Sequence, residues 1–143
     1  MKTTIAKEFK WEMSHRLPYH NGPCRNIHGH TYKMRIEISG EPDKQGMLID
    51  YFTITKIVEP LLEKLDHCFV CDDKDIDLIE FLKKMNFKIL IIPYYSTAEN
   101  LAKYIIFELI PHFETFVNIE RIKVRVYETD DVYAELFFEF NRN

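Results

Sequence analysis

The sequence lacks several features that define large classes of protein. It has no excess of positive charge, since the formal net charge is -4 over 143 residues, so no general positive field draws it onto nucleic acid or an anionic membrane. No apolar run approaches the roughly 20 residues of a membrane span. The first residues, Met1 to Met13, interleave lysines and glutamates with apolar positions, unlike a signal peptide. We therefore expect a soluble, cytoplasmic protein.

Cysteine is scarce, and internal repeats and low-complexity tracts are absent. The three cysteines, Cys24, Cys68 and Cys71, are an odd number without the spacing of a disulfide scaffold, which fits a reducing compartment. Cys68 and Cys71 form a single CxxC without the glycine and proline context of redox proteins, so packing or solvent exposure is favoured over a redox role. Because 46% of the residues are hydrophobic, one continuous core is expected, and residues 1–143 are predicted to form a single domain.

The hydrophobic pattern predicts an α+β fold. A period of two indicates strands, and apolar residues three or four apart indicate amphipathic helices. The predicted strands are residues 9–15, 28–38, 122–128 and 132–140, and the predicted main helices are residues 54–65 and 98–110. The insertion between these helices, residues 68–95, is expected to contain a short helix at 75–85 and an extended piece at 87–92. The order of elements favours an antiparallel sheet.

Prolines and capping residues set the expected limits of the two main helices. Pro60 removes a backbone hydrogen bond, so it is expected to kink or divide the first helix. Ser96 and Glu99 have the spacing of a capping box at the start of the second helix. Pro111 is expected to close that helix.

Three histidines form the most informative pattern. His28 and His30 lie two apart in a predicted strand, so both imidazoles point to one face and can reach one metal ion. His15, at the end of the preceding strand, supplies a third nitrogen if the two strands are neighbours. Three neutral imidazoles are a zinc set that leaves one coordination position for water or substrate. The alternative for each histidine alone is an ordinary surface or core residue.

Cys24 lies in the predicted loop between those strands, four positions before His28. Zinc and the neighbouring Arg25 would both favour its thiolate, the form that acts as a base at neutral pH. The alternative role for Cys24 is a fourth zinc ligand, which would close the site to substrate.

Two further acidic positions are candidates. Asp66 directly precedes His67 after the first helix, where a carboxylate can fix the tautomer of an imidazole for proton relay, although such pairs also merely cap helix ends. Glu128 ends an otherwise apolar strand face, where a carboxylate needs a partner. A ligand with paired N–H donors would be such a partner.

Six segments together resemble the 6-pyruvoyl-tetrahydropterin synthase and 6-carboxytetrahydropterin synthase family. In order along nearly the whole chain they are His15–Leu17, Cys24–Tyr32, Gly46–Asp50, Leu65–His67, Ser96–Ala102 and Val126–Thr129. The resemblance implies the tunnelling fold, a four-stranded antiparallel sheet with two helices on one face. It further implies that subunits join their sheets into a barrel, stack as a homohexamer and share the active site.

The resemblance also implies residue roles. The zinc ligands fall on His15, His28 and His30, the catalytic cysteine on Cys24, the proton relay on Asp66 and His67, the pterin clamp on Glu128, and the lining of the pterin pocket on Thr97 and Glu99. The substrate would be a small-molecule pterin triphosphate, with no nucleic-acid or membrane partner. Arg16 and Arg25 flank this site, and their charge would suit the triphosphate.

The spacing of Cys24 and His28 bears on the outcome of the reaction. It is Cys-x3-His here, as in the bacterial carboxy-forming enzymes of queuosine biosynthesis, whereas the pyruvoyl enzymes resemble Cys-x5-His. The favoured reaction therefore converts 7,8-dihydroneopterin triphosphate and water to 6-carboxy-5,6,7,8-tetrahydropterin, acetaldehyde and triphosphate. The alternatives are a 6-pyruvoyl-tetrahydropterin synthase that eliminates triphosphate from the same substrate, and a non-catalytic zinc- or pterin-binding module.

Overall fold

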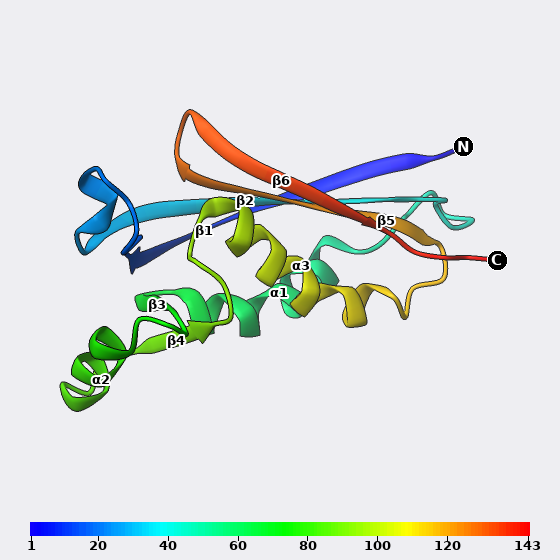
Figure 1. Ribbon diagram of the computed structural model, residues 1–143. Coiled ribbons are helices and arrows are strands. Elements are labelled where there is room, and N and C mark those ends of the chain that lie inside the picture. The colour runs from blue at the N-terminus through cyan, green and yellow to red at the C-terminus, as the bar shows by residue number, and fades with distance from the viewer.

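A six-stranded sheet forms the centre of the computed structural model, which describes residues 1–143 (Figure 1). The strands are β1 (Thr3–His15), β2 (His28–Gly40), β3 (Cys68–Asp72), β4 (Ile89–Ile92), β5 (Ile119–Thr129) and β6 (Val132–Glu139), in the order β4-β3-β1-β2-β5-β6. The helices are α1 (Tyr51–Leu65), α2 (Ile76–Lys84) and α3 (Ala98–Phe113), with a short 3-10 turn at Pro23–Arg25. None of the helices combines the length and the apolar character that a membrane span requires.

The predicted four-stranded sheet is wrong in strand number, although the α+β class and the four antiparallel strands are present. β1, β2, β5 and β6 pair in antiparallel fashion, and the insertion adds β3 and β4 as parallel strands beside the end of β1. β3 was missed because all of its five residues are buried. A strand covered on both faces has no alternation for a period-two search to find.

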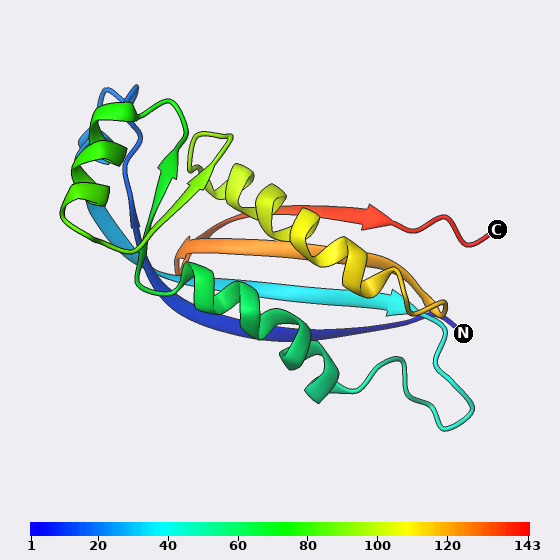
Figure 2. The same ribbon diagram turned by 90° about the horizontal axis from the view of Figure 1, so that it is seen from below.

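The two long helices cover one face of the antiparallel strands, as expected (Figure 2). Both helices turn apolar stripes towards the sheet, and α1 buries Ile54, Val58, Leu61 and Leu65 in the same core cluster as the inward-facing residues of the strands. The face of the sheet that the helices cover is also the face that carries the candidate site. The residues of β1 and β2 that face the helices include, at one end of the sheet, the histidines.

Both prolines lie inside helices, so Pro60 does not divide α1 and Pro111 does not end α3. α1 runs without interruption from Tyr51 to Leu65 through Pro60. Pro60 and Lys56, whose carbonyl loses its helical partner, are both exposed, so water can satisfy that carbonyl. α3 continues past Pro111 because Phe113 is fully buried in the core and holds the last turn in place.

The predicted capping box is displaced by one residue. Thr97, not Ser96, is the N-cap of α3, and its hydroxyl accepts a hydrogen bond from the backbone N–H of Asn100 at 3.1 Å. Ser96 is buried and bonds to His15 instead. Both hydroxyl residues suit an N-cap, and only the position of His15 decides between them.

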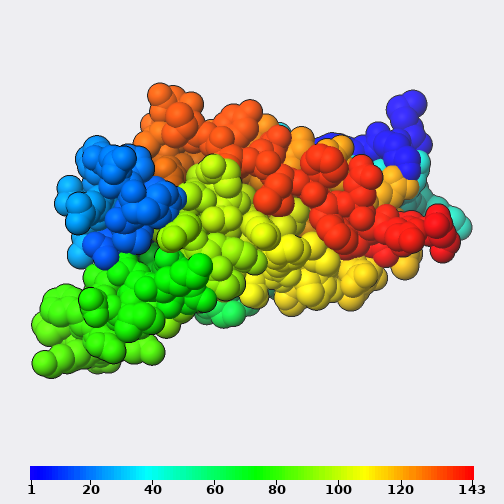
Figure 3. Space-filling model, viewed as in Figure 1, coloured from blue at the N-terminus to red at the C-terminus, as the bar shows by residue number.

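The insertion contains the predicted short helix and extended piece as α2 and β4. Cys68 belongs to the main core, whereas Cys71 packs in a separate small cluster with Phe69, Ile79 and Leu82. The two thiols therefore lie on opposite faces of β3, and the packing interpretation of this CxxC is confirmed. In the space-filling view the loop after β1 lies against the insertion (Figure 3).

Candidate metal centre

Three imidazoles converge where β1 and β2 pair. The strand register places His15 opposite His28 and Met13 opposite His30, so the three rings share one face. Their centroids are 4.6 Å apart for His15 and His28, 5.3 Å for His15 and His30, and 5.0 Å for His28 and His30. One nitrogen of each ring lies within 4.8 Å of the other two. The expected convergence is present.

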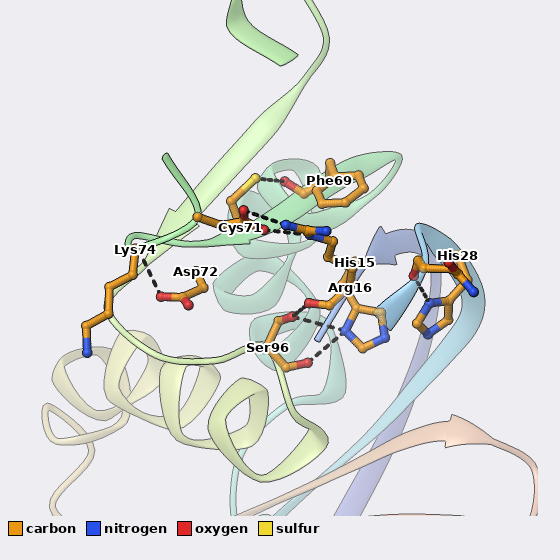
Figure 4. A network of polar contacts seen from close by, with 10 residues as sticks. His15, Arg16, His28, Phe69, Cys71, Asp72, Lys74 and Ser96 are labelled. Atoms are coloured by element: carbon orange, nitrogen blue, oxygen red, sulfur yellow. Dashed lines mark hydrogen bonds and ion pairs between the residues drawn. The ribbon is translucent and has the colours of Figure 1, made fainter. Parts of the chain in front are cut away.

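In two of these rings, a hydrogen bond at Nδ1 orients the free Nε2 on the other side of the ring. His15 Nδ1 lies 2.8 Å from the backbone oxygen of Ser96 and 3.1 Å from its Oγ, and His28 Nδ1 lies 2.7 Å from the backbone oxygen of Asn26 (Figure 4). A carbonyl only accepts, so Nδ1 carries the proton in both rings and Nε2 presents its lone pair. The Nε2 atoms of His15, His28 and His30 are all buried without a hydrogen-bond partner in the protein.

Burial favours the neutral form of His15 and His30. Removal of His15 from water lowers its pKa from 6.5 to about 4 and outweighs the hydrogen bond that the ring donates to the Ser96 carbonyl, which raises the pKa. The pKa of His30 is lowered as well, first by burial and then by the neighbouring His28. A metal binds the neutral form of imidazole. Buried polar atoms are nearly always paired, so three buried, unpaired imidazole nitrogens this close together fit a divalent ion of the zinc type.

Glu128 borders the same centre. Its Oε1 lies 4.0 Å from His15 Nε2, too far for a hydrogen bond but close enough to face a common ligand. The pKa of Glu128 is raised, mainly by burial. The nearby His28 lowers this pKa, and Glu99 raises it further. A cavity of about 490 Å³ is lined by Glu128, Glu99, Ala98, Ala102 and the residues Val132–Leu136. Thr97 caps α3 and is not among the lining residues.

Cys24 lies in the short 3-10 turn before β2 and is half-buried. The backbone N–H of Leu17 donates to the carbonyl of Cys24 at 2.8 Å, so the loop folds back onto its own start. Tyr32, fully buried beside the His30 ring at a centroid distance of 5.3 Å, has a pKa raised by burial, with contributions from Glu128, Cys68 and Cys24.

Asp66 and His67 form a pair of their own. Their side chains lie 3.0 Å apart, and the backbone N–H of Glu12 donates to Asp66 Oδ1, which lowers the pKa of that carboxyl. The His67 side chain is 75% exposed and has a positive φ of 60°. The His67 side chain lines a hollow together with Glu12, Met13, Ser14, Gly29, His30, Thr31 and Cys68. No hydrogen bond or ion pair joins it to Cys24 or the three imidazoles.

Three features escaped the sequence reasoning. Ser96 fixes the His15 ring, and its hydroxyl was assigned to a helix cap instead. Arg16 was expected to serve the triphosphate, but its guanidinium forms two 2.8 Å hydrogen bonds to Asp75 of the insertion. Tyr32 was not predicted to lie beside the site. Its position two residues after His30, on the same face of the strand, was the only sequence pattern that indicated this.

The comparisons with known proteins agree with this arrangement. The profile of the family described as 6-pyruvoyl tetrahydropterin synthase matches residues 4–139, so the chain belongs to that family. A Haemophilus influenzae protein named 6-carboxy-5,6,7,8-tetrahydropterin synthase is 36% identical over 139 residues, covering 92% of this chain and 96% of its own. A Pyrococcus horikoshii protein, named a putative 6-carboxy-5,6,7,8-tetrahydropterin synthase, is 32% identical over 96% of this chain and 94% of its own.

Solved structures share the fold. The 6-pyruvoyl tetrahydropterin synthase of Plasmodium vivax superimposes with a TM-score of 0.80 at 19% identity, covering 98% of this chain and 99% of its own. At that identity the likeness concerns the fold alone. The match extends over the insertion as well as the antiparallel strands.

Proposed function

We propose that this protein is a zinc-dependent lyase of the cytoplasm that converts 7,8-dihydroneopterin triphosphate and water to 6-carboxy-5,6,7,8-tetrahydropterin, with release of acetaldehyde and triphosphate, in queuosine biosynthesis. One observation carries the proposal: the buried, unpaired Nε2 atoms of His15, His28 and His30 lie close enough to share one ion. The names of the relatives support the pterin substrate and the carboxy-forming outcome.

The three histidines would hold zinc with one coordination position open. A zinc ion bound there would act as a Lewis acid on the oxygens of the substrate's side chain. Ser96 and the backbone of Asn26 orient two of the rings, because each holds an Nδ1 proton and so directs Nε2 to the ion. The neutral state of His15 and His30 at pH 7 means that no proton must leave before the ion binds.

Glu128 and the adjoining cavity would bind the pterin. Its carboxylate can accept two parallel hydrogen bonds from the 2-amino group and a ring N–H, a fork comparable to a carboxylate pairing with arginine. A carboxylate that is partly buried without such donors is costly, and burial already raises the pKa of Glu128. Bound pterin would therefore lower that pKa again. Glu99 lines the same cavity.

The thiolate of Cys24 would remove a carbon-bound proton from the substrate, and His67, oriented by Asp66, would exchange protons with it. Within one chain the His67 side chain pairs with Asp66 and forms no hydrogen bond or ion pair with Cys24. We therefore propose that the site is completed between subunits of a homohexamer, with the Asp66–His67 pair supplied by a neighbouring copy.

The pyruvoyl-forming reaction is the second candidate, since it would use every residue named above. The Cys-x3-His spacing of Cys24 and His28 favours the carboxy-forming reaction, and so do the names of the relatives at 36% and 32% identity. The third candidate, a non-catalytic zinc- or pterin-binding module, would retain the histidines and the cavity without turnover.

Product analysis separates the three candidates. The zinc-loaded protein is incubated with 7,8-dihydroneopterin triphosphate, and the products are identified by mass spectrometry together with an assay for acetaldehyde. We expect acetaldehyde and 6-carboxytetrahydropterin in equal amounts. A pyruvoyl product without acetaldehyde would establish the second candidate. Tight substrate binding with no product would establish the third.

A further inference from the structure

We propose that Arg16 and Asp75 are positioning residues through which the insertion holds both a metal ligand and the thiol loop. The proposal rests on the metal site proposed above for one of its two readouts. It gives the insertion, residues 68–95, a role in the site although none of its side chains forms a hydrogen bond or ion pair with the three imidazoles.

The contact itself is specific. The Nε and Nη2 atoms of Arg16 donate to the two carboxylate oxygens of Asp75, each at 2.8 Å. The Asp75 side chain is 9% exposed and that of Arg16 is 30% exposed, so the pair is partly shielded from water. A bidentate guanidinium–carboxylate pair fixes orientation as well as distance. Arg16 is therefore committed to the insertion and is not free to meet a phosphate.

The Asp75 side chain binds Arg16 and does not cap the helix α2. It occupies the N-cap position of α2, where an aspartate side chain usually accepts a hydrogen bond from the helix. Here its side chain makes no capping bond. Its backbone is held by the carbonyl of Asp72 at 3.1 Å, and the Asp72 carboxylate accepts from the Lys74 N–H. These backbone contacts of the turn before α2 direct the Asp75 carboxylate away from the helix and towards Arg16.

Arg16 lies between the candidate metal ligand His15 and Leu17, which contacts the Cys24 loop. His15, directly before it, has its ring fixed by Ser96, and the same Ser96 hydroxyl donates to the Arg16 carbonyl at 3.4 Å. Leu17, directly after it, donates its N–H to the Cys24 carbonyl at 2.8 Å. Figure 4 shows the contacts of the Arg16 guanidinium and of the His15 ring from the same short stretch of backbone. A shift of Arg16 would displace the metal ligand and the thiol together.

The test compares Asp75→Asn, which keeps the size of the side chain but removes its charge, with Asp73→Asn at a neighbouring exposed position. Arg16→Lys, which removes the bidentate geometry, is a second route to the same loss, and Asp75→Glu tests rescue. The readouts are Co²⁺ affinity and the Co²⁺ absorption spectrum, the rate of iodoacetamide alkylation at Cys24 followed by peptide mapping, and the denaturant midpoint. Cys68 and Cys71 are buried, so Cys24 is the thiol open to the reagent.

We expect Asp75→Asn and Arg16→Lys to bind Co²⁺ about tenfold more weakly, the lower end of the loss seen when a metal ligand's outer partner is removed, and to alkylate faster at Cys24. Asp73→Asn should match the wild type, and Asp75→Glu should recover part of both losses. Wild-type values for both readouts in Asp75→Asn would overturn the proposal. So would losses that follow a general fall in the denaturant midpoint. Failure of the wild type to bind Co²⁺ would instead refute the metal site. The alkylation rates would still test whether the Arg16–Asp75 contact holds the Cys24 loop.

Discussion

Acidification of the metal-free protein should destabilise it through His15. The buried ring has a pKa of about 4 in the folded chain, against 6.5 for an ordinary histidine. Between these values the unfolded chain binds a proton that the folded chain does not bind, so folding stability falls as the pH is lowered. The contribution of His15 is fully present above about pH 6.5 and is lost as the pH falls towards 4.

The size of the effect follows from the two pKa values. Each pH unit between them corresponds to about 1.4 kcal/mol, so acidification from pH 7 to pH 4 should remove about 3 kcal/mol from the free energy of unfolding through His15. The His15 side chain is 1% exposed, so little solvent screening reduces this value. The lowered pKa of His30 acts in the same direction.

Urea unfolding of the metal-free protein at a series of pH values measures this loss. His15→Gln should show a much smaller dependence on pH over the same interval, whereas His112→Gln, at an exposed position near the end of α3, should follow the wild type. Identical pH dependence in the wild type and His15→Gln would refute the reasoning. Excess zinc should make the wild-type dependence steeper, because metal and proton compete for the same nitrogens.

Other predictions concern chemistry and assembly. Cys24→Ala should retain zinc, measured by metal analysis, but lose turnover by on the order of 10²- to 10⁴-fold, as expected for a general base; loss of zinc would make the thiol a structural ligand. Glu128→Gln should weaken pterin binding in calorimetry roughly tenfold to a hundredfold, because a hydrogen bond to a charged group contributes about 1.5–3 kcal/mol, and unchanged affinity would remove Glu128 from the pocket. Co-expressed Cys24→Ala and His67→Ala chains, each inactive alone, should regain part of the activity in mixed oligomers; no recovery would place both residues in the site of one chain. Ser96→Ala should weaken zinc binding about tenfold, and an unchanged dissociation constant would show that the backbone oxygen orients His15 unaided.

The convergence of the three histidines was predictable from the sequence because strand parity and ligand geometry obey the same rule. Residues two apart point the same way in a strand, so the alternation that identified β2 also placed His28 and His30 on one face. The antiparallel register of β1 and β2 then brought His15 opposite His28. A local pattern was sufficient at this place, since β1 and β2 are consecutive strands that pair with each other.

Failures of prediction arose where the answer depends on distant contacts. β3 is buried throughout, and its pairing with β1 has no local signature. Ser96 and Thr97 are equally good caps in isolation, and the choice depends on a histidine 81 positions away in the sequence. Asp66 and His67 are adjacent in the chain, so their pairing was predictable. The lack of a hydrogen bond or ion pair between this pair and Cys24 within one subunit was not, because it depends on where the end of α1 lies relative to the loop after β1.

X-ray absorption at the zinc edge of the zinc-loaded protein tests the metal centre most directly. We predict three nitrogen neighbours at about 2.0–2.1 Å together with one light atom from solvent, which dihydroneopterin triphosphate should displace or perturb. A sulfur neighbour at about 2.3 Å, or a fourth nitrogen unaffected by that ligand, would contradict a centre that is open to substrate.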